Sequence, residues 1–354
     1  MKKVLITAVS IAMFLTVGCQ ENQKSQNYSS RNQNKARNIN NFDLMSLRER
    51  ANSILHKSLS SKSGLIRAHA IEVVSETDRK DLMPSVVKLL KDEKLLVRFV
   101  AVMAIGDMNY KPGALSVKPL LEDKHIDVQI AAAYTLTKLR KENQYSLIIK
   151  HLKSKDQTIR ANAALLIGKL GKKDAHKHLK WVLNDKDSSY GVKVQATEAL
   201  AMLNIDKKTT YERLWTLLVS KFADDKISGI KGMRLLNTKN SRAAISTMLV
   251  DKIPETPKTS KMPNMSEIPE IRLFAAEQLG RMSDYSGKKA VVDYFTNIRP
   301  LKDEKSREQA DRLAAMAIGR IGGPELTKHI PILLNSRNKD VQLWAAQAVL
   351  LLTK

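Results

Sequence analysis

Short apolar stretches recur along this chain with the spacing of amphipathic helices, and the clearest of them ends at a glycine. It covers residues 97–106 and reads VRFVAVMAIG. Related stretches begin thirty-one and sixty-two residues later, at Val128 and Ile159. A fixed period of this size is typical of a solenoid in which each repeat is a helix pair that buries its apolar face against its neighbours. The pattern therefore predicts an all-α repeat array.

About nine helix pairs are expected between residues 42 and 354. In the second helix of each pair an apolar residue is followed by a slot that often holds Arg, and a small residue comes three places later. Small residues allow neighbouring helices to approach closely. The first helices are expected at 44–59, 82–90, 114–121, 145–152, 175–183, 211–219, 243–250, 288–295 and 325–334. The second helices are expected to begin near residues 65, 96, 127, 158, 192, 226, 271, 310 and 341. The Arg slot holds Arg67, Arg98, Gln129, Arg160, Lys193, Arg272, Asp311 and Gln342.

These copies resemble the HEAT repeat, in the short bacterial version shared with phycobilin lyases. The best copy is Leu89–Asp92 followed by Val97–Gly106, and 159–168 and 271–280 are also close. The resemblance implies a right-handed α-solenoid. The copy at 227–236 fits poorly, because Lys231 falls in the small slot. Two local roles are expected from helix-end chemistry: left-handed C-caps at Gly106, Gly168, Gly280 and Gly319, and N-caps at Asp92, Asp123 and Asp156.

The period is interrupted twice in the C-terminal half. Residues 251–270 form a proline-rich insertion with four prolines, which excludes a continuous helix. Residues 297–309 form a second, highly charged insertion. Such loops either carry recognition or are tolerated excursions. The last helix ends in an apolar run at 349–352, so we expect that face to be packed inward, the alternative being that the end of the array docks onto something.

The N-terminus indicates export. Lys2 and Lys3 precede an apolar run at 4–17 that is too short for an ordinary membrane span. The run leads to Gly18-Cys19, which resembles the lipobox of bacterial lipoproteins. This resemblance implies a signal peptide at 1–18 and lipidation of Cys19, the single cysteine. Gln20 after it implies the periplasmic side of the outer membrane in a Gram-negative cell. The alternative is an ordinary cleaved signal. Residues 19–41, rich in Asn, Gln and Ser, are expected to be a disordered tether.

Composition adds a formal net charge of +24. Either lysines on the exposed helix faces simply keep the protein soluble, which we favour, or the charge binds an anionic polymer or lipid surface. No dense basic run with interleaved aromatics is present, and export further disfavours nucleic acid as a partner.

No catalytic, cofactor-binding or metal-ligating constellation is found in the sequence. None of the seven histidines precedes Glu, which excludes the His-Glu pairs of the HEAT-repeat di-iron hydroxylases. Nucleophile elbows, Walker loops and dinucleotide fingerprints are lacking. We therefore expect a protein that is not an enzyme. A phycobilin-lyase-like enzyme, or another enzyme with an unrecognised pocket, is kept as an alternative.

One comparison between repeats suggests a partner site. The slots one and five places after the Arg slot are expected to face the inner curve of the superhelix. The later slot is polar in several repeats: Glu72, Glu198, Glu277 and Gln347. In repeats two to four, apolar or aromatic residues fill these slots: Phe99, Met103, Ile130, Tyr134 and Leu165. We hypothesise that this apolar strip binds a protein or peptide. The alternative is that neighbouring helices bury it. The leading expectation is a membrane-tethered scaffold of the bacterial cell envelope, its oligomeric state left open.

Overall fold

The computed structural model describes residues 30–172, 174–249 and 268–354, and every regular element in these ranges is helical. They contain nine helix pairs, which confirms the predicted α-solenoid. The first helices are α2 (Ser30–Leu59), α4 (Met83–Lys88), α6 (Ala114–Val117), α8 (Tyr145–Lys150), α10 (Ala175–Asn184), α12 (Lys207–Leu218), α14 (Lys239–Ser246), α16 (Lys288–Asp293) and α18–α19 (Pro324–Thr327, Ile330–Leu334). The second helices are α3 (Gly64–Glu76), α5 (Leu95–Asp107), α7 (Ile126–Lys138), α9 (Gln157–Leu170), α11 (Tyr190–Leu203), α13 (Ala223–Leu236), α15 (Pro269–Arg281), α17 (Glu304–Ile321) and α20 (Lys339–Leu352).

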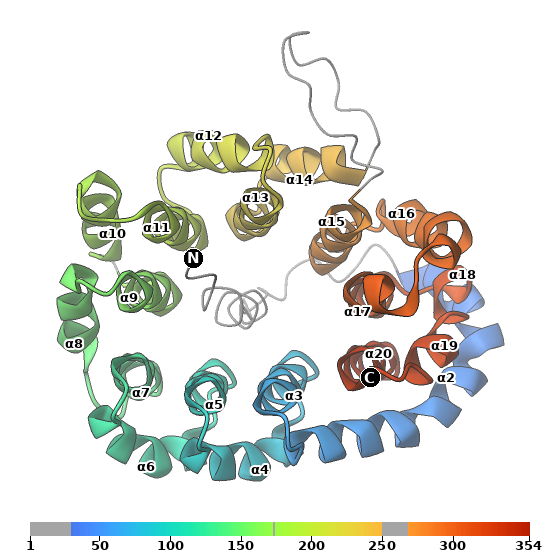
Figure 1. The fold of residues 1–354 in the computed structure, drawn as a ribbon, viewed down its shortest axis with the longest axis horizontal. Helices are drawn as coiled ribbons and strands as arrows, with labels where there is room; N and C mark the ends of the chain where they lie inside the picture. Colours follow the sequence, from blue (N-terminus) through green and yellow to red (C-terminus); the bar gives the residue numbers. More distant parts are fainter. Residues whose placement is uncertain (1–29, 173, 250–267) are drawn as a thin grey trace, which may run out of the picture. The chain divides into compact units, whose positions relative to one another are not determined.

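The helices divide between two compact units. Among the described residues, unit 1 comprises 59–219 and 231–236, and unit 2 comprises 30–58, 220–230 and 237–354. Within unit 1, α3, α5, α7, α9 and α11 follow one another as one layer, and α4, α6, α8 and α10 form the other (Figure 1). Within unit 2, α15, α17 and α20 form the corresponding second-helix layer. None of the described helices has the length and apolar character of a membrane span.

The second helices stack so closely that some contacts exclude a side chain. A Cβ built on Gly168 of α9 would lie 2.6 Å from the Ala199 Cβ of α11, and one on Gly106 would lie 2.7 Å from the Thr135 hydroxyl of α7. The same holds for Gly280 and Gly319. These glycines lie inside helices, so the expected C-caps are wrong. Their role is close helix packing. The left-handed cap of α9 is Gly171, with φ +63°.

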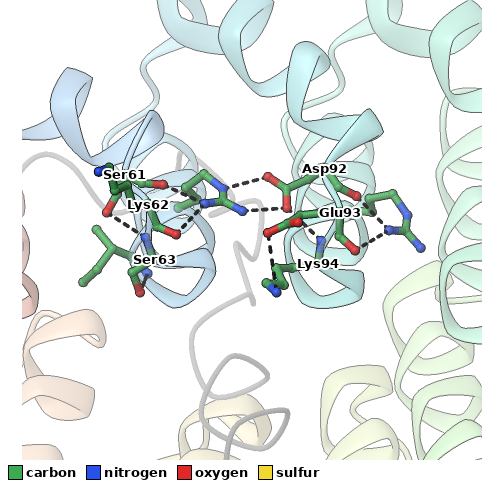
Figure 2. A network of polar contacts seen from close by, with 9 residues as sticks. Ser61, Lys62, Ser63, Asp92, Glu93 and Lys94 are labelled. Carbon is green, nitrogen blue, oxygen red and sulfur yellow. Dashed lines mark hydrogen bonds and ion pairs between the residues drawn. The ribbon is translucent and has the colours of Figure 1, made fainter.

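Arginine–aspartate pairs join successive repeats of unit 1. Nε of Arg98 lies 2.8 Å from Asp123 Oδ2, and its Nη2 lies 2.9 Å from Oδ1. The remaining Nη1 donates to the carbonyl of Asp92, 2.7 Å away. Arg67 binds Asp92 in the same bidentate way while it donates to the loop carbonyls of Ser61 and Lys62, and Figure 2 shows this network. We call each such pair a rung. A rung ties one second helix to its own loop and to the loop of the next repeat.

The rungs correct the expected roles of the aspartates. Asp156 is an N-cap, because it accepts from the backbone N–H of Thr158 and Ile159. The caps of α5 and α7 are instead Lys94 and His125. Asp92 and Asp123 accept one N–H each from those caps, but their bidentate partners are arginines of the preceding repeat.

One rung of unit 1 lacks both of its charged members. The third Arg slot holds Gln129, whose Nε2 still donates to the Asp123 carbonyl at 2.6 Å. Ser154 stands where an aspartate would complete the rung, with the same backbone conformation as Asp92 and Asp123. The fourth rung, Arg160 to Asp185, restores the charge pair at 2.5 Å. Guanidinium and carboxylate are therefore lost together, as expected if neither is tolerated alone in a half-buried loop.

Unit 2 reverses the polarity of the interaction. Asp311, in the Arg slot of α17, is bound by the Arg299 guanidinium through contacts of 2.6 and 3.0 Å. The Tyr294 hydroxyl donates to the same carboxylate at 2.8 Å. The predicted charged insertion at 297–309 is therefore partly structured: it contributes Arg299 to this pair, and α17 begins at Glu304 instead of near residue 310.

Helix α2 covers the C-terminal end of unit 2. Arg48 donates to the Thr353 carbonyl just after α20, at 2.5 Å, and Arg50 donates to the carbonyl of Leu334, the last residue of α19, at 2.8 Å. Cations at helix C-termini satisfy unpaired carbonyls and complement the helix dipole. The array therefore ends against another helix, while Val349 and Leu350 are also buried.

Three other expectations change. Residues 30–41, assigned to the tether, belong to α2, whose 30 residues contain neither Gly nor Pro to stop a helix. Residues 1–29, with the predicted signal peptide, Cys19 and the start of the tether, lie outside the described residues, as does 250–267 of the proline-rich insertion. Pro269, its last proline, begins α15, where a missing N–H costs nothing.

In α13 the Arg slot is Lys226, three residues after the helix start as in α5, so Lys231 occupies the later slot and not the small one.

Replacing the charged pair of the second rung with the glutamine and serine of the third rung should destabilise the array. We expect the double variant Arg98→Gln/Asp123→Ser to lower the free energy of unfolding by about 2 kcal/mol, since hydrogen bonds to charged groups are lost. The reciprocal variant Gln129→Arg/Ser154→Asp should raise Tm by about 2 °C. Chemical and thermal denaturation followed by circular dichroism measure both. Ser154→Asp alone is the control, and if it stabilises as much as the double variant, the rung is not the cause.

Two glycines three residues apart should differ in their sensitivity to substitution. Gly168→Val should destabilise by about 3 kcal/mol, because its side chain meets Ala199 of the adjacent helix. Gly171→Asn should change stability by less than about 1 kcal/mol, because asparagine tolerates positive φ and nothing lies within 4 Å of the added Cβ. Equal destabilisation of both variants would contradict the packing role of Gly168.

Candidate functional site

The structure buries all five residues of the hypothesised partner strip. Phe99 is 7% exposed, and the other four are exposed by 2% or less: Met103, Ile130, Tyr134 and Leu165. The expectation of an exposed apolar strip is therefore wrong, and the alternative reading is the correct one. Adjacent second helices approach so closely through small residues that the helix on either side covers these slots.

A cluster of charged side chains lies where the strip had been expected. The Tyr134 hydroxyl of α7 donates to Asp107 Oδ1 of α5, at 2.5 Å. Lys138 Nζ lies 3.1 Å from the same oxygen and 2.8 Å from the Tyr134 hydroxyl. Lys169 Nζ of α9 reaches Asp107 Oδ2 at 2.5 Å, across two repeats. We call these four residues the Asp107 cluster. It joins three second helices through one carboxylate.

Burial and charge set the protonation of this cluster. Burial disfavours the ionised carboxyl of Asp107, but Lys169 and Lys138 more than compensate, so its pKa lies below the ordinary value. Burial, together with the adjacent Asp107 charge, raises the pKa of Tyr134 well above its ordinary value. Burial lowers the pKa of Lys169, partly offset by Asp107. At neutral pH the cluster therefore holds a carboxylate and a neutral phenol, each already in a hydrogen bond.

A second buried pair lies further along the same layer. Lys231 Nζ of α13 is 2.8 Å from Glu198 Oε2 of α11, and both side chains are 3% exposed. Gln195 Nε2 donates to the same oxygen at 3.0 Å. Glu198 occupies the later slot, so this slot is buried here too and its polar residue is neutralised by the next helix.

Unit 2 uses the same arrangement independently. Glu277, in the later slot of α15, is fully buried and accepts hydrogen bonds from Arg281 and Gln278 of its own helix. Arg320 of α17 approaches it at 3.9 Å. In both units, a buried glutamate of the later slot, Glu198 or Glu277, is thus bound by polar side chains of the same layer.

A comparison of copies at another slot would have revealed the cluster. The ninth position after the Arg slot holds Asp107, Lys138 and Lys169 in consecutive repeats, which are opposite charges brought side by side by stacking. The hypothesis of an apolar strip rests on the first and fifth positions alone. Residues that carry no apolar signal therefore escaped notice.

Titratable side chains also lie outside the second-helix layer. Within the described ranges, no group of three or more His, Cys, Asp or Glu side chains could hold a metal ion. His329 stacks on Phe295 with ring centroids 4.0 Å apart, and burial lowers its pKa. Its ring packs against an aromatic side chain, and no ion pair with a carboxylate of the described residues involves it.

A family-model match agrees with the helical-repeat fold in part of unit 1. Residues 114–201, all in unit 1, match the family model described as HEAT repeats. Among solved structures, the chain is similar to the complex of CpcE and CpcF of phycocyanin lyase from Nostoc sp. PCC7120, at 16% identity over 71% of this chain and 94% of that chain, with a TM-score of 0.43. It is also similar to human deoxyhypusine hydroxylase, at 13% identity over 79% and 97% of the two chains and a TM-score of 0.34. An engineered protein aligns at 16% identity over 98% and 99%, with a TM-score of 0.28. A search of curated proteins finds no match.

Acid should weaken the Asp107 cluster. Because the pKa of Asp107 in the folded chain lies below its ordinary value of about 4, its stabilisation is complete above that value and is lost as pH falls towards the folded pKa. We expect Asp107→Asn to cost about 3 kcal/mol at pH 7, since two ammonium groups lose their carboxylate. The variant should also lose less stability than the parent as pH falls below about 4, the ordinary value for this carboxyl, because the parent then begins to protonate Asp107. Urea denaturation at each pH measures both, and an unchanged pH slope would contradict the assignment.

Proposed function

We propose that the chain is a non-enzymatic scaffold of the bacterial cell envelope, held at a membrane by lipidated Cys19, which binds a protein partner. HEAT repeats and an α-solenoid provide the framework. The lipobox resemblance at Gly18-Cys19 supports the tether, with the periplasmic side of the outer membrane as its expected place in a Gram-negative cell.

The observation that carries the scaffold proposal is the division of roles between the two layers. Side chains of the second-helix layer pair with each other and fix the stacking, as in the Asp107 cluster and the Glu198–Lys231 pair. The first-helix layer of unit 1 is solvated and bears exposed apolar side chains, among them Leu115, which is 85% exposed. A rigid support with a varied outer layer is suited to holding a partner.

This division of roles favours the first-helix layer as the candidate partner surface. The sequence placed it on the inner curve, at residues that the structure buries. The first-helix layer of unit 1 offers exposed positions on α4 and α6, such as Lys88 and Leu115.

Site-specific photo-crosslinking in the native envelope tests the proposal. A photoreactive residue at Lys88 or Leu115 should give one defined protein adduct, and one at Ala161, on second helix α9, should not. Adducts from Ala161 alone would return the site to the second-helix layer. Failure of all three positions to trap any protein would contradict the scaffold.

The tether has a separate readout. Cys19→Ser should abolish fatty-acid labelling and reduce the amount of protein that remains with membranes after a high-salt wash. Retained labelling would refute lipidation at this residue. Because the anchor and the partner surface are proposed on different residues, the protein adduct should still form with the variant when the partner is supplied in solution.

A further inference from the structure

Five exposed lysines of repeats four and five lie on two first helices of unit 1 and the loops that follow them, and no ion pair among the described residues holds them although Asp156 and Asp187 are their neighbours in sequence. They come from helices α8 and α10 and from the loops that follow: Lys150, Lys153, Lys155, Lys177 and Lys186. All five are exposed, and none forms an ion pair with a carboxylate of the described chain. Some other exposed lysines form ion pairs, as Lys118 does with Glu142 at 2.7 Å and Lys180 with Asp206 at 2.6 Å. The five unpaired ammonium groups therefore form a local excess of positive charge.

A tryptophan lies within this excess. Trp181 of α10 is 41% exposed, whereas Trp344 is fully buried. Lys153 Nζ lies 5.7 Å from the centroid of the Trp181 ring, which joins repeat four to repeat five. The same two repeats are also joined by the Tyr145 hydroxyl, which donates to Asp174 at 3.2 Å. We call the five lysines and Trp181 the α8–α10 surface.

The chemistry of this surface distinguishes among anionic partners. Protein interfaces are depleted in lysine and enriched in arginine, whose planar fork binds carboxylates in a fixed geometry. Here all five cations are lysines, mobile point charges suited to a diffuse array of phosphates. Tryptophan is the side chain enriched where hydrocarbon meets headgroups, because its ring is apolar and its N–H is polar. Lysines around a half-exposed tryptophan therefore match the boundary of an anionic bilayer better than an acidic protein.

We propose that the α8–α10 surface docks unit 1 on an anionic phospholipid membrane, with the lysines at the lipid phosphates and Trp181 at the level of the headgroups. This contact is distinct from the lipid anchor. The anchor would hold one end of the chain at the membrane, whereas the surface would fix which side of unit 1 faces it. The proposal does not depend on the protein partner.

Vesicle binding by the full-length Cys19→Ser chain tests the electrostatic part. This Cys19→Ser chain, the parent for the variants below, should bind phosphatidylglycerol–phosphatidylcholine vesicles more tightly than phosphatidylcholine vesicles. Moderate salt should weaken this preference. Lys150→Ser/Lys153→Ser/Lys177→Ser should reduce the preference about 100-fold, since juxtamembrane lysines act roughly additively. The matched control Lys88→Ser/Lys91→Ser/Lys111→Ser removes the same charge from exposed, unpaired positions in repeats two and three. It should lose less than tenfold. Equal losses in the two triple variants would overturn the proposal in favour of diffuse net charge.

Tryptophan fluorescence tests the orientation. Lipids brominated near the headgroup should quench the emission of the parent, and Trp181→Phe should remove that quenching while vesicle binding persists. Quenching that survives in Trp181→Phe would show that this residue does not reach the bilayer. Binding to polyglutamate without binding to vesicles would also overturn the proposal and assign the surface to an acidic protein. Unchanged helical circular dichroism confirms that each variant is folded.

Discussion

The fold of unit 1 depends on bidentate pairing between an arginine of one repeat and an aspartate of the next. Apolar stacking alone brings helices together, but it leaves their rotation and sliding poorly fixed, because alanine-rich faces are smooth. A guanidinium that binds a loop carbonyl on one side and a carboxylate on the other fixes both the rotation of the helix and its position along its neighbour. The pair at Arg98 and Asp123 is the clearest case, with each side chain 7% exposed. The uncharged Gln129 and Ser154 show that both members change together when a rung is dropped.

The sequence predicted the array itself well, because period and small-residue spacing are local signals that recur in most of the repeats. It mispredicted residues whose role depends on the neighbour. Gly168 has the sequence appearance of a helix stop, yet Ala199 of the next helix explains it. Tyr134 has the appearance of a surface anchor, yet it is covered and bonded to Asp107. The distance between stacked helices decides these cases, and no pattern within a single repeat contains that distance.

Charge is distributed unequally between the two helix layers, and this distribution shows where the excess of basic residues lies. In the second-helix layer, acids and bases are matched one against another, as at Glu198 and Lys231. The surplus that makes the chain strongly basic therefore remains on the first helices and on the loops between helices. An average over the whole chain conceals this division. The net charge describes what the exposed face presents to its surroundings, and the buried charges concern only the stacking of the repeats.

The contacts of helix α2 imply that unit 2 is completed late in synthesis. Arg48 and Arg50 bond to atoms 305 and 284 residues further along the chain, whereas the rungs of unit 1 span 25 residues. Contacts so distant in sequence form late, because a long loop must close before they contribute. Unit 1 can assemble repeat by repeat as the chain emerges. Unit 2 cannot be completed until the final residues have left the ribosome, so a chain that stops short would leave the end of α2 without its partners.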